Sequence, residues 1–149
     1  MLTKDVLVRI GGVQAAVGSE SENMEVITAG RHYLKNGKHY ILYEEVMEGF
    51  SEPTYNTVKI MHGRLEIIKK GVVKAYMVFE PGKRHIADYV TPYGGFTIGI
   101  DTNTLTIEES EECIIVNTDY MLELNYEHHA RCSIVLEAAS RQSGSFTIS

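Results

Sequence analysis

Turn-forming residues recur at short and regular intervals along this chain, and their spacing limits the possible folds more than any other feature. The pairs Asn36-Gly37 and His62-Gly63 are of this kind. From Gly63 onward the gaps are 8, 11, 12 and 9 residues, with turn residues at Gly71, Gly82, Gly94 and Asn103. This spacing is typical of short antiparallel strands joined by hairpins.

Composition also favours strands. Val, Ile and Thr together number 38, whereas the helix formers Leu and Ala together number 17. No helical periodicity is sustained over three turns. We therefore predict an all-β chain of ten or eleven strands, near residues 3–17, 22–35, 38–48, 54–61, 64–69, 72–79, 83–91, 95–101, 104–109, 112–127 and 129–139.

So many sequential hairpins leave sheet edges that must be protected, and closure into a barrel removes both edges. We therefore predict a single antiparallel up-and-down β-barrel domain over residues 1–149, with a β-sandwich as the alternative. Residues 140–149 form a polar tail in this prediction, unless Phe146 and Ile148 dock on a strand edge.

Charge and cysteine content exclude several functions. The formal net charge is −6 and the basic residues are scattered, which argues against nucleic-acid binding. No apolar run has the length of a signal-peptide core or a membrane span, so we expect a cytoplasmic protein. Cys113 and Cys132 match neither a zinc-ribbon nor a C-x-x-C spacing. We expect two reduced thiols, no metal and no cofactor.

Hairpin registers assign side chains to the two faces of the sheet. A two-residue His62-Gly63 turn places Val58, Ile60, Leu65 and Ile67 on the inward face. A three-residue loop over 69–71 continues that face with Val73, Ala75, Met77 and Phe79. The strand near 112–127 alternates clearly, and its predicted inward residues are Ile114, Val116, Thr118, Tyr120, Leu122, Leu124 and Tyr126.

The hairpin at Asn36-Gly37 gives the first group of candidate site residues. A type I′ turn there pairs His32 with Ile41, Gly30 with Tyr43 and Thr28 with Glu45. If Ile41 points inward, the barrel interior holds a polar group that consists of Thr28, His32, Tyr43 and Glu45. This group is either a satisfied internal network, a solvated rim, or a binding or catalytic site in which His32 and Glu45 transfer a proton.

A second group lies on the strand near 83–91, where His85, Ala87 and Tyr89 share an inward face because the opposite register would bury Asp88. These side chains either pack with their polar tips at the barrel mouth or contact a ligand. The predicted ligand-binding set is therefore Thr28, His32, Tyr43, Glu45, His85 and Tyr89. Nucleophile-elbow, P-loop and dinucleotide-binding motifs are absent from the sequence, and we assign no catalytic residue.

Four segments also resemble a known family: residues 28–35 (TAGRHYLK), 40–45 (YILYEE), 79–82 (FEPG) and 89–94 (YVTPYG). Their order and spacing are similar to those of the YwiB-like family of small bacterial proteins, across roughly residues 5–138. The resemblance implies a calycin-like barrel of the lipocalin type, with Tyr43, Glu45 and Tyr89 as inward positions. It implies no activity.

Three functions are compatible with this sequence. The first is non-catalytic binding of a small apolar or amphipathic molecule inside the barrel. The second is a protein-interaction or structural module, and here we predict a homodimer through an outward face that bears Val72, Tyr76 and Val78. The third is a hydrolase or isomerase that uses His32 with Glu45.

Overall fold

The computed structural model describes residues 2–16 and 22–141, and every regular element within them is a β-strand. The predicted all-β class is confirmed. The ten strands are β1 (Asp5–Ala16), β2 (Glu22–Lys35), β3 (Lys38–Val46), β4 (Pro53–Met61), β5 (Arg64–Lys70), β6 (Ala75–Phe79), β7 (Arg84–Thr91), β8 (Gly94–Glu109), β9 (Cys113–Leu124) and β10 (His128–Ser140).

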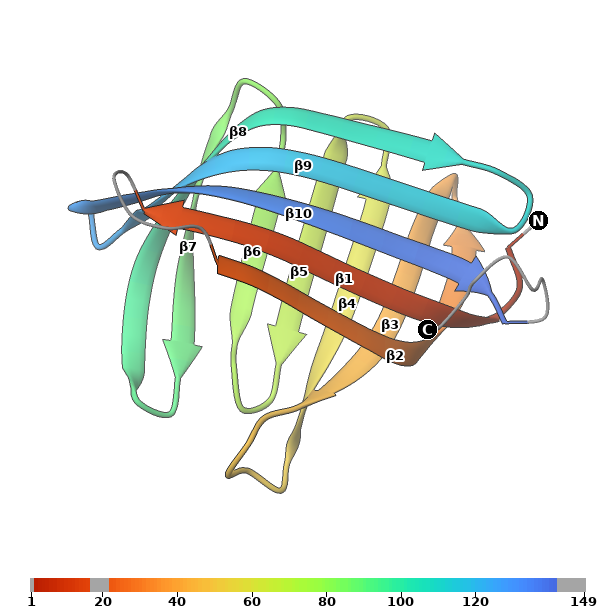
Figure 1. Ribbon diagram of the computed structural model, residues 1–149, viewed down its shortest axis with the longest axis horizontal. Helices are drawn as coiled ribbons and strands as arrows, with labels where there is room; N and C mark the ends of the chain where they lie inside the picture. The colour runs from red at the N-terminus through yellow and green to blue at the C-terminus, as the bar shows by residue number, and fades with distance from the viewer. Residues whose placement is uncertain (1, 17–21, 142–149) are drawn as a thin grey trace.

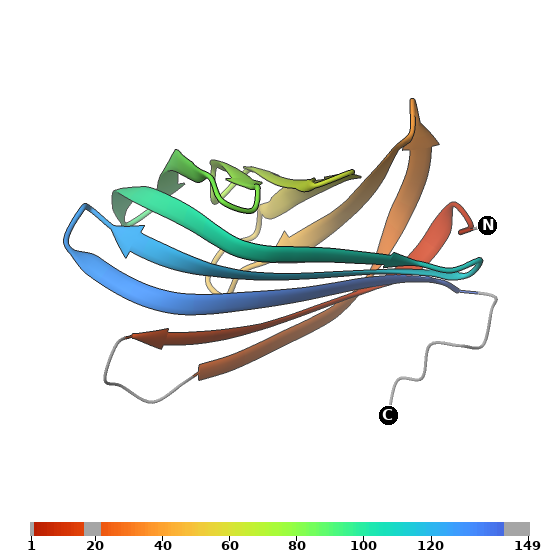
Figure 2. The same ribbon diagram turned by 90° about the horizontal axis from the view of Figure 1, so that it is seen from above.

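The strands form one antiparallel sheet in the order β6-β5-β4-β3-β2-β1-β10-β9-β8-β7. The two ends of this sheet are joined by a bridge between Lys74, just before β6, and Val90 of β7, in which each amide donates to the other's carbonyl, at 3.0 and 2.9 Å. The sheet therefore forms a nearly closed barrel. Figure 1 shows β8, β9, β10, β1 and β2 side by side, with β3 to β7 behind them at a steep angle, and Figure 2 shows these two layers from above.

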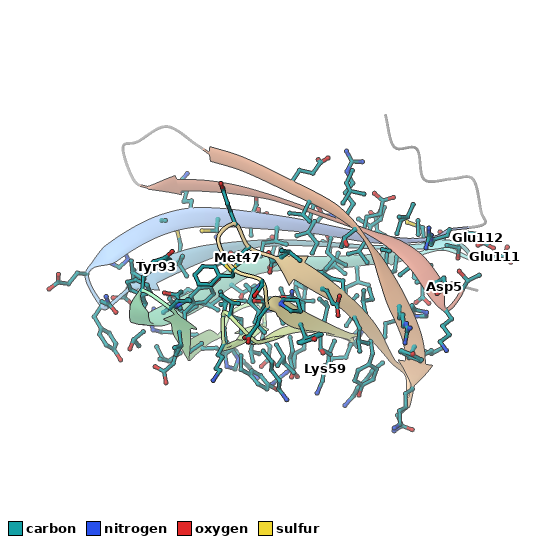
Figure 3. All side chains as sticks on the ribbon, turned by 90° about the horizontal axis from the view of Figure 1, so that it is seen from below. Asp5, Met47, Lys59, Tyr93, Glu111 and Glu112 are labelled. Atoms are coloured by element: carbon teal, nitrogen blue, oxygen red, sulfur yellow. The ribbon has the colours of Figure 1, made fainter. Side chains whose placement is uncertain are left out.

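Because successive strands run up and down, the hairpin connections gather at two ends of the barrel. Asp5 lies near the turns at 36–37, 62–63 and 110–112, whereas Tyr93 lies near the connections at 47–52 and 125–127. We call these the Asp5 end and the Tyr93 end. Figure 3 shows Asp5, Glu111 and Glu112 at one side of the molecule and Met47 and Tyr93 at the other.

A packed core fills the half of the barrel toward the Asp5 end. Phe79 is fully buried and makes an edge-to-face contact with Tyr120, with ring centroids 5.0 Å apart. The predicted inward residues of β4 and β5 are buried, and the predicted register of their hairpin is confirmed. The fully buried aliphatic side chains come from most strands, and they include Val6, Val8, Ile41, Val58, Leu65, Ile100, Ile114, Val116 and Leu136.

The connection between β5 and β6 is longer than predicted. Lys69 pairs with Ala75, so five residues lie between these partners instead of the three-residue loop expected over 69–71. The register changes by an even number of residues, and a side-chain period of two preserves the faces. Val73, Ala75 and Phe79 are buried as predicted, and Met77 packs against the core.

The predicted turn at Asn103 is wrong. The ladder of β8 with β9 runs from Thr102 opposite Tyr120 directly to Thr104 opposite Asp119, which leaves Asn103 as an extra residue. This is a β-bulge, and a bulge bends a strand without ending it. The two strands predicted over 95–101 and 104–109 are therefore one strand, β8.

The predicted inward position of Tyr126 is also wrong. Asn125 and Tyr126 adopt positive φ angles of 50° and 64° and form the turn between β9 and β10. Asn125 binds Thr97 twice, through its backbone amide and its side-chain oxygen. Tyr126 is consequently exposed, while Tyr120, Leu122 and Leu124 keep the predicted inward face.

The outward apolar face predicted for β6 is smaller than expected. Val78 is buried, and its cross-strand partner Glu66 belongs to an ionic network with Arg64 and Tyr76 on the outer surface. Tyr76 is about half exposed and donates its hydroxyl proton to Glu66. This face does not offer three free apolar side chains to a partner.

At the C-terminal side, Ser140 is the last residue of β10 and is buried, so it belongs to the barrel and not to the predicted tail. Residues 142–149, which include Phe146 and Ile148, lie outside the described part of the chain. Within the described ranges the protein has no helix that could cross a membrane.

Candidate functional site

The β2–β3 hairpin adopts the predicted register. Asn36 and Gly37 have φ angles of 54° and 75°, as a type I′ turn requires at both central positions. His32 pairs with Ile41 and Gly30 with Tyr43. The described ladder ends at Gly30 and Tyr43, and β2 and β3 are not paired beyond it. Thr28 and Glu45 therefore do not form the predicted pair.

A cavity of about 230 Å³ lies inside the barrel toward the Tyr93 end, beside this separation of β2 and β3. Val26 of β2 and Glu45 of β3 both border it. Most of its wall is apolar and consists of Ile10, Val26, Ile67, Met77, Ile134 and Leu136. The polar part of the wall comes from Tyr43, Glu45, Lys69, Tyr120, Cys132 and Ser133.

An ion pair lies at the polar side of this cavity. The ammonium Nζ of Lys69 donates to Oε1 of Glu45 at 3.1 Å and to Oδ1 of Asn56 at 2.8 Å. The Asn56 side-chain amide also donates to Glu45 Oε1, at 3.3 Å. Only 14% of the Lys69 side chain is exposed, against 34% for Glu45. The cluster is therefore a partly buried, charge-balanced group with one carboxylate oxygen, Oε2, left for another donor.

Tyrosine hydroxyls surround the same region. Burial raises the pKa values of Tyr43 and Tyr89, and the negative charge of Glu45 raises both further. The Tyr120 pKa is likewise raised by burial and by its contact with the Cys132 thiol. These three phenols are therefore neutral hydrogen-bond donors near pH 7. Tyr43 is only 8% exposed, but its hydroxyl is not sealed off, because Oγ1 of Thr102 is the only buried side-chain polar atom without a partner among residues 2–16 and 22–141.

His32 lies at the opposite end of the barrel interior. Its Nε2 is 2.8 Å from Nδ1 of His39, whose Nε2 is 3.1 Å from Oε1 of Glu109. His32 faces inward like Glu45, but the two are about four residues apart along the sheet, or ~13 Å. The predicted contact between His32 and Glu45 is therefore wrong. Burial, and then the neighbouring His39, lower the His32 pKa.

Two more predicted site residues lie away from the cavity. His85 Nε2 is 2.9 Å from Oε1 of Glu80, which also binds Arg64 on the outer surface. Thr28 donates to the carbonyl of Ala29 and lines a surface groove between β2 and β3. Of the six predicted residues, Tyr43 and Glu45 line the cavity, and Tyr89 interacts electrostatically with both of them.

Sequence reasoning missed the polar partners of Glu45. The sequence predicts a loop at Lys69, whereas this residue is an inward residue of β5 that pairs with Asn56 of β4. The register that places Val58 opposite Ile67 also places Asn56 opposite Lys69, on the same face. Two polar residues at inward positions, next to buried aliphatic ones, were the available signal.

Within the described ranges, no group of three or more His, Cys, Asp or Glu side chains could hold a metal ion. Both cysteines are free. Cys132 faces the cavity, whereas Cys113 interacts with Glu137. The available site chemistry is hydrogen bonding and ion pairing next to an apolar wall.

Comparisons with known proteins agree with this fold. A solved structure titled as the crystal structure of the ywiB protein from Bacillus subtilis aligns with a TM-score of 0.75, over 92% of this chain and 93% of that one. At 21% identity this likeness shows the fold alone. No curated protein matches the chain. The model of a domain of unknown function, DUF1934, matches residues 8–136. The chain therefore belongs to the DUF1934 family, as its resemblance to the YwiB-like proteins implied.

Proposed function

We propose that this protein binds a small amphipathic molecule, reversibly and without catalysis, in the cavity at the Tyr93 end. The observation that carries the proposal is the division of the cavity wall into an apolar side and a polar side. Burial of apolar ligand surface supplies affinity, and a few fixed polar groups supply orientation. Ile67 and Met77 represent the first kind of group, and Lys69 and Tyr43 the second.

The position of Tyr43 supports the same proposal. Its side chain is largely buried and lines the cavity, yet its hydroxyl is not a buried atom without a partner. Burial and the charge of Glu45 raise the Tyr43 pKa, so the hydroxyl is a neutral donor. A ligand acceptor that takes this hydrogen bond is oriented against the apolar wall.

A screen with a plugged variant tests this function. Native mass spectrometry of freshly purified protein and a thermal-shift screen of small apolar and amphipathic compounds identify ligands. Ile134→Trp fills the cavity from β10, and Val135→Trp adds the same ring on the exposed outer side of the same strand. We expect Ile134→Trp to abolish the thermal shift of each ligand and Val135→Trp to preserve it. Ligands that bind both variants equally well contradict the proposal.

A second candidate function is self-association, and the free edge of β2 favours it. Beyond Gly30, the described residues of β2 have no ladder partner on the β3 side. Val26 and Ile27, which lie on opposite faces of this segment, are 40% and 39% exposed. An unpaired strand edge can add a strand from a second copy. Light scattering that reports a 16.7 kDa species at high concentration rules this candidate out.

A further inference from the structure

We infer that the cavity selects a ring-sized ligand that carries no net charge and accepts a hydrogen bond. This inference rests on the proposed function and specifies the class of its ligand. Three properties of the cavity carry it: the volume, the balance of charges on the wall, and the neutral phenol of Tyr43 that lines it.

The volume limits the ligand to about the size of a substituted ring. A protein cavity of about 150 Å³ accommodates benzene, and drug-sized ligands occupy pockets of about 300–1,000 Å³. At about 230 Å³, this cavity lies between the two. A long-chain fatty acid exceeds this volume and could bury only part of its chain in the cavity.

The charge balance selects against an ion. Lys69 contributes one positive charge to the wall and Glu45 one negative charge, and these two groups already pair with each other. An anion must share the ammonium with Glu45, and a cation must share the carboxylate with Lys69. In either case one charge in a partly buried site lacks full compensation, which costs free energy. A ligand without net charge leaves the pair intact.

The hydrogen-bonding groups select for an acceptor. Tyr43 lines the cavity with a neutral hydroxyl, and the ammonium of Lys69 donates to Glu45 and Asn56 and has a third N–H group that a ligand can accept. Oε2 of Glu45 can accept one donor from the ligand in return. A carbonyl, amide or hydroxyl group on a small apolar body matches this arrangement.

Benzamide, benzoate and benzamidinium test the inference because they have nearly the same shape and carry charges of 0, −1 and +1. Their binding can be followed by the protection of Cys132, which lines the cavity, against alkylation. We expect the unmodified chain to bind benzamide about tenfold or more tightly than either ion. Equal or tighter binding of an ion overturns the inference and leaves the proposed function intact. If none of the three compounds binds saturably, the inference that the ligand is a ring-sized molecule with a hydrogen-bond acceptor is overturned.

Charge variants sharpen the test. Glu45→Gln gives the wall a net positive charge, so benzoate should become the preferred ligand, and Lys69→Gln should favour benzamidinium for the opposite reason. The double variant is neutral and should again prefer benzamide, even if one single variant folds poorly. Glu44→Gln and Lys70→Gln remove the neighbouring exposed charges and should keep the original order of preference. An unchanged order in all the charge variants that fold contradicts the role of the pair.

If the proposed function itself is wrong, the binding experiments give a different result. In that case the plugged variant Ile134→Trp binds the same compounds as the unmodified chain, whatever their charge. Failure of the inference alone leaves binding sensitive to the plug but indifferent to ligand charge. The two results are therefore distinguishable in one set of proteins.

Discussion

Nζ of Lys69 on β5 lies 3.1 Å from Oε1 of Glu45 on β3, although these two strands are not neighbours in the sheet. Asn56, on the strand between them, binds both partners and fixes their geometry. The barrel thereby places a matched pair of charges against an apolar cavity wall. This arrangement makes predictions for stability as well as for binding.

The two halves of this pair should differ in their effect on stability. Glu45→Gln leaves the more buried Lys69 ammonium without its counter-charge, and we expect a loss of about 1–3 kcal/mol in the free energy of unfolding. Lys69→Met leaves a carboxylate that water can reach, so we expect the free energy of unfolding to fall by only about 1 kcal/mol. Urea denaturation of both single variants and the double variant should give a favourable coupling energy of about 1 kcal/mol. Additive effects contradict the pairing.

His32 should make the folded protein sensitive to mild acid. Because burial and His39 lower its pKa below 6.5, the unfolded chain binds the proton more readily than the folded chain does. Stability should therefore fall as the pH decreases through about 6.5 toward the folded-state pKa, by at most about 1.4 kcal/mol per pH unit for one proton. Denaturation between pH 7.5 and 5.5 measures this slope.

The matched control for this slope is a histidine that lies outside the contact of His32 with His39. His32→Gln can retain a hydrogen bond to His39 Nδ1, and it should reduce the dependence of stability on pH. His62→Gln removes an exposed imidazole in the β4–β5 turn and should leave the slope unchanged. An identical slope in the His32→Gln variant and the unmodified chain excludes His32 as its source.

Gly30 should not tolerate a larger residue. A Cβ atom there lies 2.7 Å from Cγ2 of Val8 and 2.9 Å from the carbonyl oxygen of Leu42, which are both shorter than van der Waals contacts. We expect Gly30→Ala to cost about 1–3 kcal/mol, because the core must shift to accept it. Gly95→Ala is the control, since its nearest atom is 4.0 Å away. Thermal unfolding that gives similar melting temperatures for both variants contradicts the close approach at Gly30.

Deletion of Asn103 should be tolerated better than deletion of a regular strand residue. The bulge lies between two correct cross-strand pairs, so removing Asn103 preserves all of them and costs only the local bend. Deletion of Thr106 instead moves Ile107 to the opposite face. We expect the first variant to unfold cooperatively with a loss of about 1–2 kcal/mol, and the second to be severely destabilised. Circular dichroism melting curves compare the two.

The fold could be predicted from the sequence because residues close together in the chain determine its hairpin turns. The turns at Asn36-Gly37 and His62-Gly63 each determine a hairpin register by themselves, and both registers were predicted. Asn103 was misread because polarity alone does not distinguish a turn from a bulge. The inward positions change from Ile98 and Ile100 to Leu105 and Ile107, from even to odd numbers, and that change was the signal for an extra residue.

The site was less predictable because it depends on contacts between strands distant in sequence. Placing His32 beside Glu45 assumed that residues on one face of one hairpin lie close enough to touch. The sheet instead extends that face along the barrel, so His32 meets His39 at one end and Glu45 meets Lys69 toward the other. Only the closure of the sheet brings Tyr120 of β9 to the same cavity as Tyr43 of β3.

Methyl NMR of methionine tests ligand binding in the cavity most directly. Met77 lines the cavity, whereas Met61 lies at the Asp5 end of β4, and Met77→Leu assigns the resonance. We predict that a ligand from the screen shifts the Met77 methyl signal saturably, leaves that of Met61 in place, and loses this effect in the Ile134→Trp variant. A ligand that binds saturably without any change at Met77 contradicts the account.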